Sequence, residues 1–139
     1  MTARLTEVVV DARDPEALAA FWCAVLDYVV IDSDPGRVVE IAPARVATPE
    51  LLSRVRSGPV VPSVVFVANP DRKTVKNRVH LDVSPTDASL ADEVARIEAL
   101  GAVRVDVGQG EGRSWVVLAD PEGNEFCVLR SLAEGEFDG

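Results

Sequence analysis

The chain carries one local pattern twice, and this repeat limits the folds that it can adopt. The two copies are residues 5–26, with the sequence LTEVVVDARDPEALAAFWCAVL, and residues 78–99, with the sequence RVHLDVSPTDASLADEVARIEA. Each copy contains a strand-like apolar run, an Asp and an amphipathic helical segment. Repeats of this length predict two related halves that form one core together. Glu7 and His80 are equivalent, because each lies seven residues before the Asp that precedes the helix.

The length and composition are those of a chain that can bury a core. It has 139 residues, of which 47% are hydrophobic, and its mean hydropathy is +0.13, which argues against disorder. We predict a single domain over residues 1–139. One repeat is expected over about 4–68, the second over about 76–131, and an acidic tail over 132–139.

The charge and the cysteines exclude several classes of function. The formal net charge is −9, whereas nucleic-acid binding depends on Lys and Arg at phosphates. No apolar run approaches the roughly 20 residues of a membrane span, and the N-terminus has no secretory apolar region. Cys23 and Cys127 both lie in apolar segments, which suits reduced thiols. We therefore expect a cytoplasmic protein that binds neither nucleic acid nor membranes.

Apolar periodicity and turn residues predict a strand, a helix and three strands in each half. The expected helices are 14–27, beginning with Asp14 and Pro15, a short one within 51–56, and one that begins at Thr86 or Asp87 and ends near Leu100. The expected strands are 5–11, 28–32, 38–42 and 60–67 in the first half, and 78–83, 102–107, 115–119 and 125–130 in the second. Pro62 predicts an edge strand or a bulge. This order is typical of an α+β protein with mostly antiparallel sheet.

Alternation along the strands gathers polar groups on one face of each half. Apolar side chains occupy the other face, which the amphipathic helix can cover: Val8, Val10, Val79, Leu81, Val83, Phe126 and Val128. The polar face carries Glu7, Asp11, His80, Asp82, Glu125 and Cys127. An isolated buried carboxylate costs several kcal/mol, so this face is either exposed or lines a wet cleft. Equivalent positions of Glu7 and His80 favour the cleft.

Three segments resemble the vicinal oxygen chelate superfamily, which contains glyoxalases, bleomycin resistance proteins and extradiol dioxygenases. They are DPEALAAFW at 14–22, KNRVHLDV at 76–83 and DPEGNEFCVL at 120–129. The resemblance extends from about Leu5 to Arg130 and is greatest to the small glyoxalase-like proteins of that group. It implies two βαβββ repeats that form a curved, cup-shaped mixed or antiparallel sheet. It does not specify a reaction, because this superfamily hosts many.

The same resemblance implies where a metal would bind. Metal-dependent members take ligands from the first and last strands of each half, which here correspond to Glu7, His80, Val67 and Cys127. Val67 cannot ligate, and Glu125, which lies two residues before Cys127 on the same face, could substitute as a ligand. His80 is the only histidine, so one subunit cannot build a two-His, one-carboxylate iron site. An imidazole, a carboxylate and a thiolate suit zinc.

Several other residues have both a functional and a structural interpretation. Cys127 and His80 could form a nucleophile pair, or Cys127 could be inert core. Trp115 could stack on a ligand or belong to the core. The Gly-rich segment 108–112 lacks the Lys and Ser or Thr of a phosphate loop, which leaves a hairpin or a lid, and Arg113 could meet a ligand carboxylate or be solvated. The basic stretch 72–78 is either a solvated loop or a lip that attracts anions.

Two functions fit these residues. The first is a small-molecule-binding protein without a firmly bound metal, in which His80 or Glu7 accepts a proton or the ligand is only sequestered. Its ligand would contact Asp11, Asp82, Trp115 and Glu125. The alternative is a metal-dependent lyase, isomerase or dioxygenase with a divalent ion (Zn, Mn, Fe or Ni) at Glu7, His80 and Cys127. Open sheet edges predict a homodimer in either case.

Overall fold

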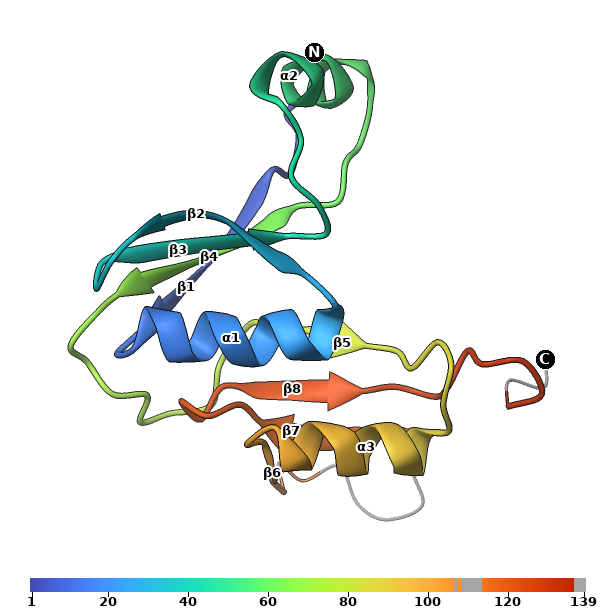
Figure 1. The fold of residues 1–139 in the computed structure, drawn as a ribbon. Coiled ribbons are helices and arrows are strands. Elements are labelled where there is room, and N and C mark those ends of the chain that lie inside the picture. The colour runs from blue at the N-terminus through green and yellow to red at the C-terminus, as the bar shows by residue number, and fades with distance from the viewer. Residues whose placement is uncertain (107, 109–113, 137–139) are drawn as a thin grey trace. The chain divides into compact units, whose positions relative to one another are not determined.

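The sequence repeat corresponds to two structural units with the same strand order (Figure 1). The computed structural model describes residues 1–106, 108 and 114–136. The units are Met1–Asp71 and Arg72–Gly139, and each contains an open, mixed four-stranded sheet with its strands in the order first, fourth, third, second. The predicted α+β class is confirmed. The predicted cup involves both sheets together and stays a prediction.

The first unit contains six helices and strands. They are β1 (Glu7–Ala12), α1 (Pro15–Leu26), β2 (Val29–Asp34), β3 (Val38–Ala42), α2 (Thr48–Ser57) and β4 (Ser63–Ala68). β1 runs parallel to β4, whereas β3 runs antiparallel to β4 and to β2. A β4 strand that pairs on both sides cannot be an edge strand, so the edge predicted from Pro62 is wrong. Pro62 precedes the strand, where it removes no ladder hydrogen bond.

Helix α1 begins and ends as the sequence predicts. The Asp14 carboxylate accepts a hydrogen bond from the Ala17 N–H at 3.1 Å, and Pro15 occupies the first turn. The helix ends at Asp27, whose φ of 56° is left-handed. Its apolar stripe includes Leu18 and Trp22, and it packs against β3 and β4. The buried apolar side chains of the helix and this sheet include Leu18, Ala19, Phe21, Trp22, Val39, Ile41 and Phe66.

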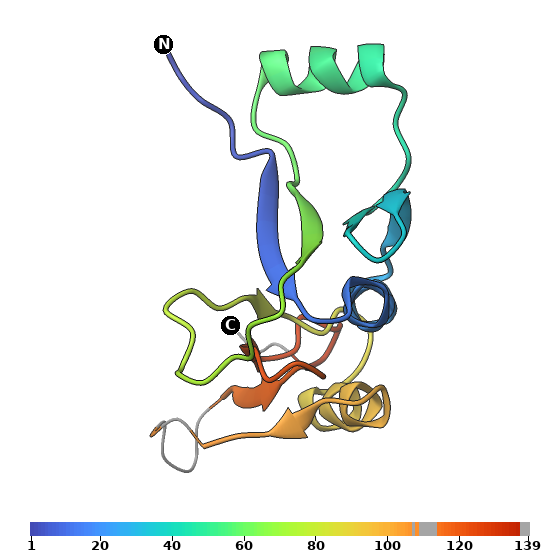
Figure 2. The same ribbon diagram turned by 90° about the vertical axis from the view of Figure 1, so that its left-hand side faces the viewer.

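Helix α2 differs from every other helix of the described chain, because none of its side chains is buried. It is longer than the helix expected within 51–56, because Pro49 is tolerated in its first turn. Figure 2 shows it standing away from the sheet of its own unit, at the end of two extended connections. The Arg4 guanidinium donates to the Val55 carbonyl at 3.0 Å, which ties the N-terminal segment to the helix.

The second unit repeats the first with shorter strands. It contains β5 (Asp82–Val83), α3 (Leu90–Ala99), β6 (Val103–Arg104), β7 (Val116–Ala119) and β8 (Glu125–Val128), and β5 runs parallel to β8. The strand predicted over 78–83 is thus two residues long. Val79 is 78% exposed, so its predicted place on the apolar face with Leu81 and Val83 is wrong.

Helix α3 begins later than the sequence suggested. Ser89, not Thr86 or Asp87, is its N-cap, and the Ser89 hydroxyl accepts from the Asp92 N–H at 3.1 Å. The helix supplies Val94 and Ile97 to the core of this unit. That core also contains Val117, Leu118, Phe126 and Val128. No helix of the described residues is long and apolar enough to cross a membrane.

Candidate functional site

The second unit brings together three side chains that can ligate a metal or exchange a proton. His80, Asp82 and Cys127 each offer one ligand atom, and these atoms lie within 4.8 Å of one another. The parallel register of β5 and β8 places Asp82 opposite Cys127, and His80, two residues before β5, reaches the same group. His80 Nε2 is 3.2 Å from Asp82 Oδ1. The predicted grouping of these residues on one face is therefore found within this unit.

The environment of Cys127 keeps its thiol protonated. Burial raises the pKa of Cys127, and the Asp82 charge and a hydrogen bond to that carboxylate raise it further, against a smaller opposing effect of Lys76. A nucleophilic Cys127 would need the opposite, because the thiolate is the reactive form. The arrangement disfavours the Cys127–His80 nucleophile pair. It suits a metal better, since a cation can replace the thiol proton and an N, O, S donor set is one that zinc accepts.

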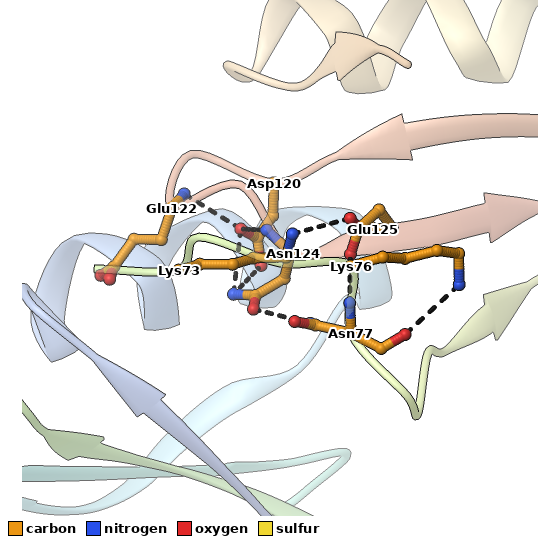
Figure 3. A network of polar contacts seen from close by, with 7 residues as sticks. All are labelled: Lys73, Lys76, Asn77, Asp120, Glu122, Asn124 and Glu125. Atoms are coloured by element: carbon orange, nitrogen blue, oxygen red, sulfur yellow. Dashed lines mark hydrogen bonds and ion pairs between the residues drawn. The ribbon is translucent and has the colours of Figure 1, made fainter. Parts of the chain in front are cut away.

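Glu125, expected to contact the ligand or help to hold a metal, has both carboxylate oxygens engaged (Figure 3). Lys73 Nζ lies 2.7 Å from one oxygen, and the Asn77 N–H donates to the other at 3.0 Å. Burial alone would raise the pKa of Glu125, but the hydrogen bonds from Lys73 and Asn77 outweigh it and lower this pKa. The carboxylate fixes the segment 73–77 to β8.

The turn before β8 is a second polar anchor for the same segment. Asp120 is buried and accepts from the Glu122 and Asn124 N–H groups, both at 3.0 Å. The Asn124 side-chain oxygen accepts from the Asn77 amide at 2.9 Å (Figure 3). Gly123 has a φ of 89°, which favours glycine. The tight turn predicted at 120–123 is confirmed, and it sets the start of the strand that carries Cys127.

The first unit contains a pocket of about 500 Å³ beneath α2. Its walls are mainly apolar, with Leu51, Leu52 and Val55 from the helix and Ile31, Ala42 and Val61 from the sheet and its connections.

Three polar residues of the sheet line the same pocket: Glu7, Glu40 and Ser63. The Ser63 hydroxyl donates to Glu40 Oε2 at 2.6 Å. Of these three residues, Glu7 was predicted as a site residue from the sequence, whereas Glu40 and Ser63 were not. Glu40 was detectable as a carboxylate that alternates with apolar residues within 38–42.

The remaining predicted site residues that the structure describes belong neither to the His80, Asp82 and Cys127 cluster nor to the walls of the pocket. Asp11 is exposed, and its carboxylate accepts from the Asn69 amide at 3.3 Å. Trp115 is half-buried and lies immediately before β7. Arg113 and most of the Gly-rich segment lie outside the described residues. Glu7 and His80 belong to different units, so their convergence on one site stays a prediction.

Comparison with known proteins identifies one sequence family and several solved structures with a similar fold. The family described as "Glyoxalase-like domain" matches residues 7–129. A glyoxalase/bleomycin resistance protein/dioxygenase family enzyme from Burkholderia phytofirmans PsJN has a TM-score of 0.64 at 19% identity, over 91% of this chain and 97% of that one. No protein of curated function matches the sequence significantly.

Two further solved structures share the fold. A variant of the fosfomycin resistance protein of Listeria monocytogenes, complexed with Mn(II) and 1S,2S-dihydroxypropylphosphonic acid, has a TM-score of 0.63 at 16% identity, over 94% of this chain and 92% of that one. Lactoylglutathione lyase from Agrobacterium tumefaciens has a TM-score of 0.54 at 18% identity, over 88% and 90%. At these identities the likeness concerns the fold alone.

Proposed function

Because this chain belongs to the glyoxalase-like domain family, we propose that it binds a small organic molecule in the pocket beneath α2. The family match also confirms the resemblance predicted from the segments at 14–22, 76–83 and 120–129. One observation carries the proposal. The pocket volume of about 500 Å³ lies within the range of about 300–1,000 Å³ typical of ligand sites, and a few polar groups interrupt its apolar wall.

A thermal-shift screen of metabolites and antibiotics tests this proposal. A ligand that binds only the folded protein raises its midpoint of unfolding, and the rise grows with the ratio of free ligand concentration to the dissociation constant. We expect hits to perturb the methyl resonances of Leu51 and Leu52, and to lose affinity when Leu52 is replaced in the variant Leu52→Asn.

The matched control is Leu132→Asn, which removes a similarly exposed leucine from the second unit. Hits that are equally weakened by both variants, or that leave the Leu51 and Leu52 methyl groups unperturbed, would place the ligand elsewhere and contradict the proposal.

The cluster of His80, Asp82 and Cys127 favours a second candidate, a metal-dependent lyase, isomerase or dioxygenase. These three residues would hold a divalent ion, with Glu7 as the carboxylate that the family pattern adds. A bound ion would act as a Lewis acid toward oxygen atoms of a substrate. The residues themselves supply an imidazole held by Asp82 and a thiol that must lose its proton to ligate.

Cobalt titration separates the two candidates. If the cluster holds metal, Co(II) should give a thiolate charge-transfer absorption that Cys127→Ser abolishes and His80→Ala strongly weakens. Glu7→Gln should weaken it as well if Glu7 also ligates. Elemental analysis of protein supplied with Zn, Mn, Fe and Ni provides the second measurement, and less than stoichiometric metal in all four preparations would reject this candidate.

A further inference from the structure

We infer that the ligand of the pocket beneath α2 is an organic cation with an apolar body. This inference rests on the proposed function and adds the charge class of the ligand to it. The pocket combines an apolar helix wall that buries no side chain with two carboxylates of the sheet.

The exposed apolar side chains of the helix wall favour a ligand with an apolar body. Leu51 and Leu52 are both more than two-fifths exposed, and Val55 continues the same apolar side of α2. A helix of ten residues is marginal in water unless its apolar face packs against something. Within the described chain this face borders the pocket and makes no buried contact. An apolar molecule of ligand size would cover it.

The sheet wall supplies the negative charge. The register pairs Glu7 on β1 with Ser63 on β4, and Glu40 on β3 with Val65, so Glu7, Ser63 and Glu40 share one face of the sheet. Ser63 occupies a single oxygen of Glu40. Within the part of the chain that the structure describes, neither Glu7 nor the second oxygen of Glu40 accepts a hydrogen bond. Both carboxylates therefore retain acceptor capacity toward a ligand.

The charge balance of the pocket selects a cation. Arg54 is the basic residue of the helix wall, and it is already paired with Glu50. Arg54 Nη2 lies 2.5 Å from Glu50 Oε1. A neutral or anionic ligand would desolvate Glu7 and Glu40 without pairing them, which is unfavourable. An ammonium group would pair with them and fill their remaining acceptor sites. The net charge of −9 adds a long-range attraction for cations and a repulsion for anions.

Three probes of equal chain length measure this preference: octylammonium, octanol and octanoate. Isothermal titration of the full chain should show that octylammonium binds about tenfold more tightly than octanol, because a hydrogen bond to a charged group contributes a free energy of this size. Octanoate should bind most weakly. Glu7→Gln and Glu40→Gln should each weaken octylammonium several-fold and leave octanol unchanged. Asp87→Asn, the same change of charge at an exposed site of the second unit, should affect neither probe.

The failure of this inference is distinguishable from that of the proposed function. Octanol or octanoate binding as tightly as octylammonium, with methyl shifts at Leu51 and Leu52, would overturn the charge class and leave pocket binding intact. Absence of those methyl shifts with all three probes would overturn both. Self-association that covers Leu52 and excludes all three probes would identify a second copy of the chain as the occupant, and would also overturn both.

Discussion

Glu125 was expected to contact a ligand or a metal, but its carboxylate instead stabilises the fold by binding Lys73 and the Asn77 N–H. Its side chain is 11% exposed, and its charge is matched by Lys73 and by the Asn77 N–H. We predict that Glu125→Gln lowers the free energy of unfolding at pH 7 by about 1.5–3 kcal/mol, the value of hydrogen bonds to a charged group. Urea unfolding measures this change.

The pH dependence of that loss follows from the direction of the pKa shift. The folded pKa of Glu125 lies below its ordinary value of 4.5, so its stabilisation is fully present above that pH. It is lost as the pH falls through the lowered folded pKa, and the difference between wild type and variant should shrink there. Glu50→Gln, which breaks an exposed pair with Arg54, is the control and should cost about 0.5 kcal/mol or less. A difference for Glu125→Gln that is constant from pH 7 to pH 3 would contradict the assigned pair.

Cys127 provides a second test at the level of a single residue. Because the pKa of this thiol is raised by burial and by Asp82, we predict that Asp82→Asn lowers it and increases thiolate at pH 8. Alkylation by iodoacetamide should become roughly two- to tenfold faster, since one pKa unit changes the thiolate fraction about tenfold. Peptide mass spectrometry reports Cys127 and Cys23 separately.

Cys23 is the internal control, because burial alone raises its pKa. Its alkylation rate should not respond to Asp82→Asn. Equal acceleration of both cysteines would indicate a general loosening of the fold, and an unchanged rate at Cys127 would show that Asp82 does not act on the thiol.

Strand alternation made part of the candidate site predictable. It correctly placed Asp82 beside Cys127 on adjacent strands, because side-chain direction has a period of two, whereas His80 joins them from the residues before β5. The Lys73–Glu125 pair was not predictable, since its partners are 52 residues apart and one lies in a loop. The hydrogen bond between Ser63 and Glu40 likewise depends on the pairing of β3 with β4. Contacts of this kind require the register of strands, which composition does not contain.

Helix α3 shows where an element begins when several capping residues compete. Thr86, Asp87 and Ser89 all have side chains that can cap, and only Ser89 does so. We predict that Ser89→Ala lowers the free energy of unfolding by about 1 kcal/mol, because the Asp92 N–H loses its partner. Asp87→Ala should change it by less than about 0.5 kcal/mol. Urea unfolding of both variants is the measurement, and a larger effect at Asp87 would contradict the assigned cap.

Helix α2 should be the least stable helix of the described chain. Its opening exposes no buried side chain, whereas opening of α1 exposes Leu18 and Trp22. We therefore predict fast amide hydrogen exchange in α2 and slow exchange in α1, with protection of α2 increased by octylammonium. Protection of α2 equal to that of α1 without any ligand would show that something already covers its apolar face in solution.

The pairing of elements was less predictable than their existence. The strands at 38–42 and 125–128 follow from apolar alternation, but the central place of β4 does not, because β1 and β4 pair across about 56 residues of chain. Segment 78–81 has strand-like residues and is not a strand, since only Asp82 and Val83 meet β8 in register. The residue types of a segment indicate that it can form a strand, and its pairing with neighbouring strands determines how long the strand is.

The repeat itself was the most reliable guide to the whole molecule. Both units join their first strand in parallel to their last, and both use the order first, fourth, third, second. Residues 43–62 have no counterpart in the second half of the sequence, and they carry α2. The repeated scaffold and α2 both lie within residues 7–129, which the family matches, and the helix wall of the pocket comes from the segment that breaks the repeat.

Open edges of both sheets lead to the last prediction, a homodimer. Within its sheet, β6 pairs on one side only, and Val103 on that strand is 58% exposed. Unpaired edges and exposed apolar residues favour association with a twofold partner. Light scattering after gel filtration should give about twice the 14.9 kDa of one chain.

If this edge forms the interface, Val103→Lys should shift the mass toward one chain, whereas Leu132→Lys, which changes an exposed leucine outside the strands, should not. A mass of one chain at every concentration from micromolar to submillimolar would exclude the dimer, because an interface of useful size holds at such concentrations.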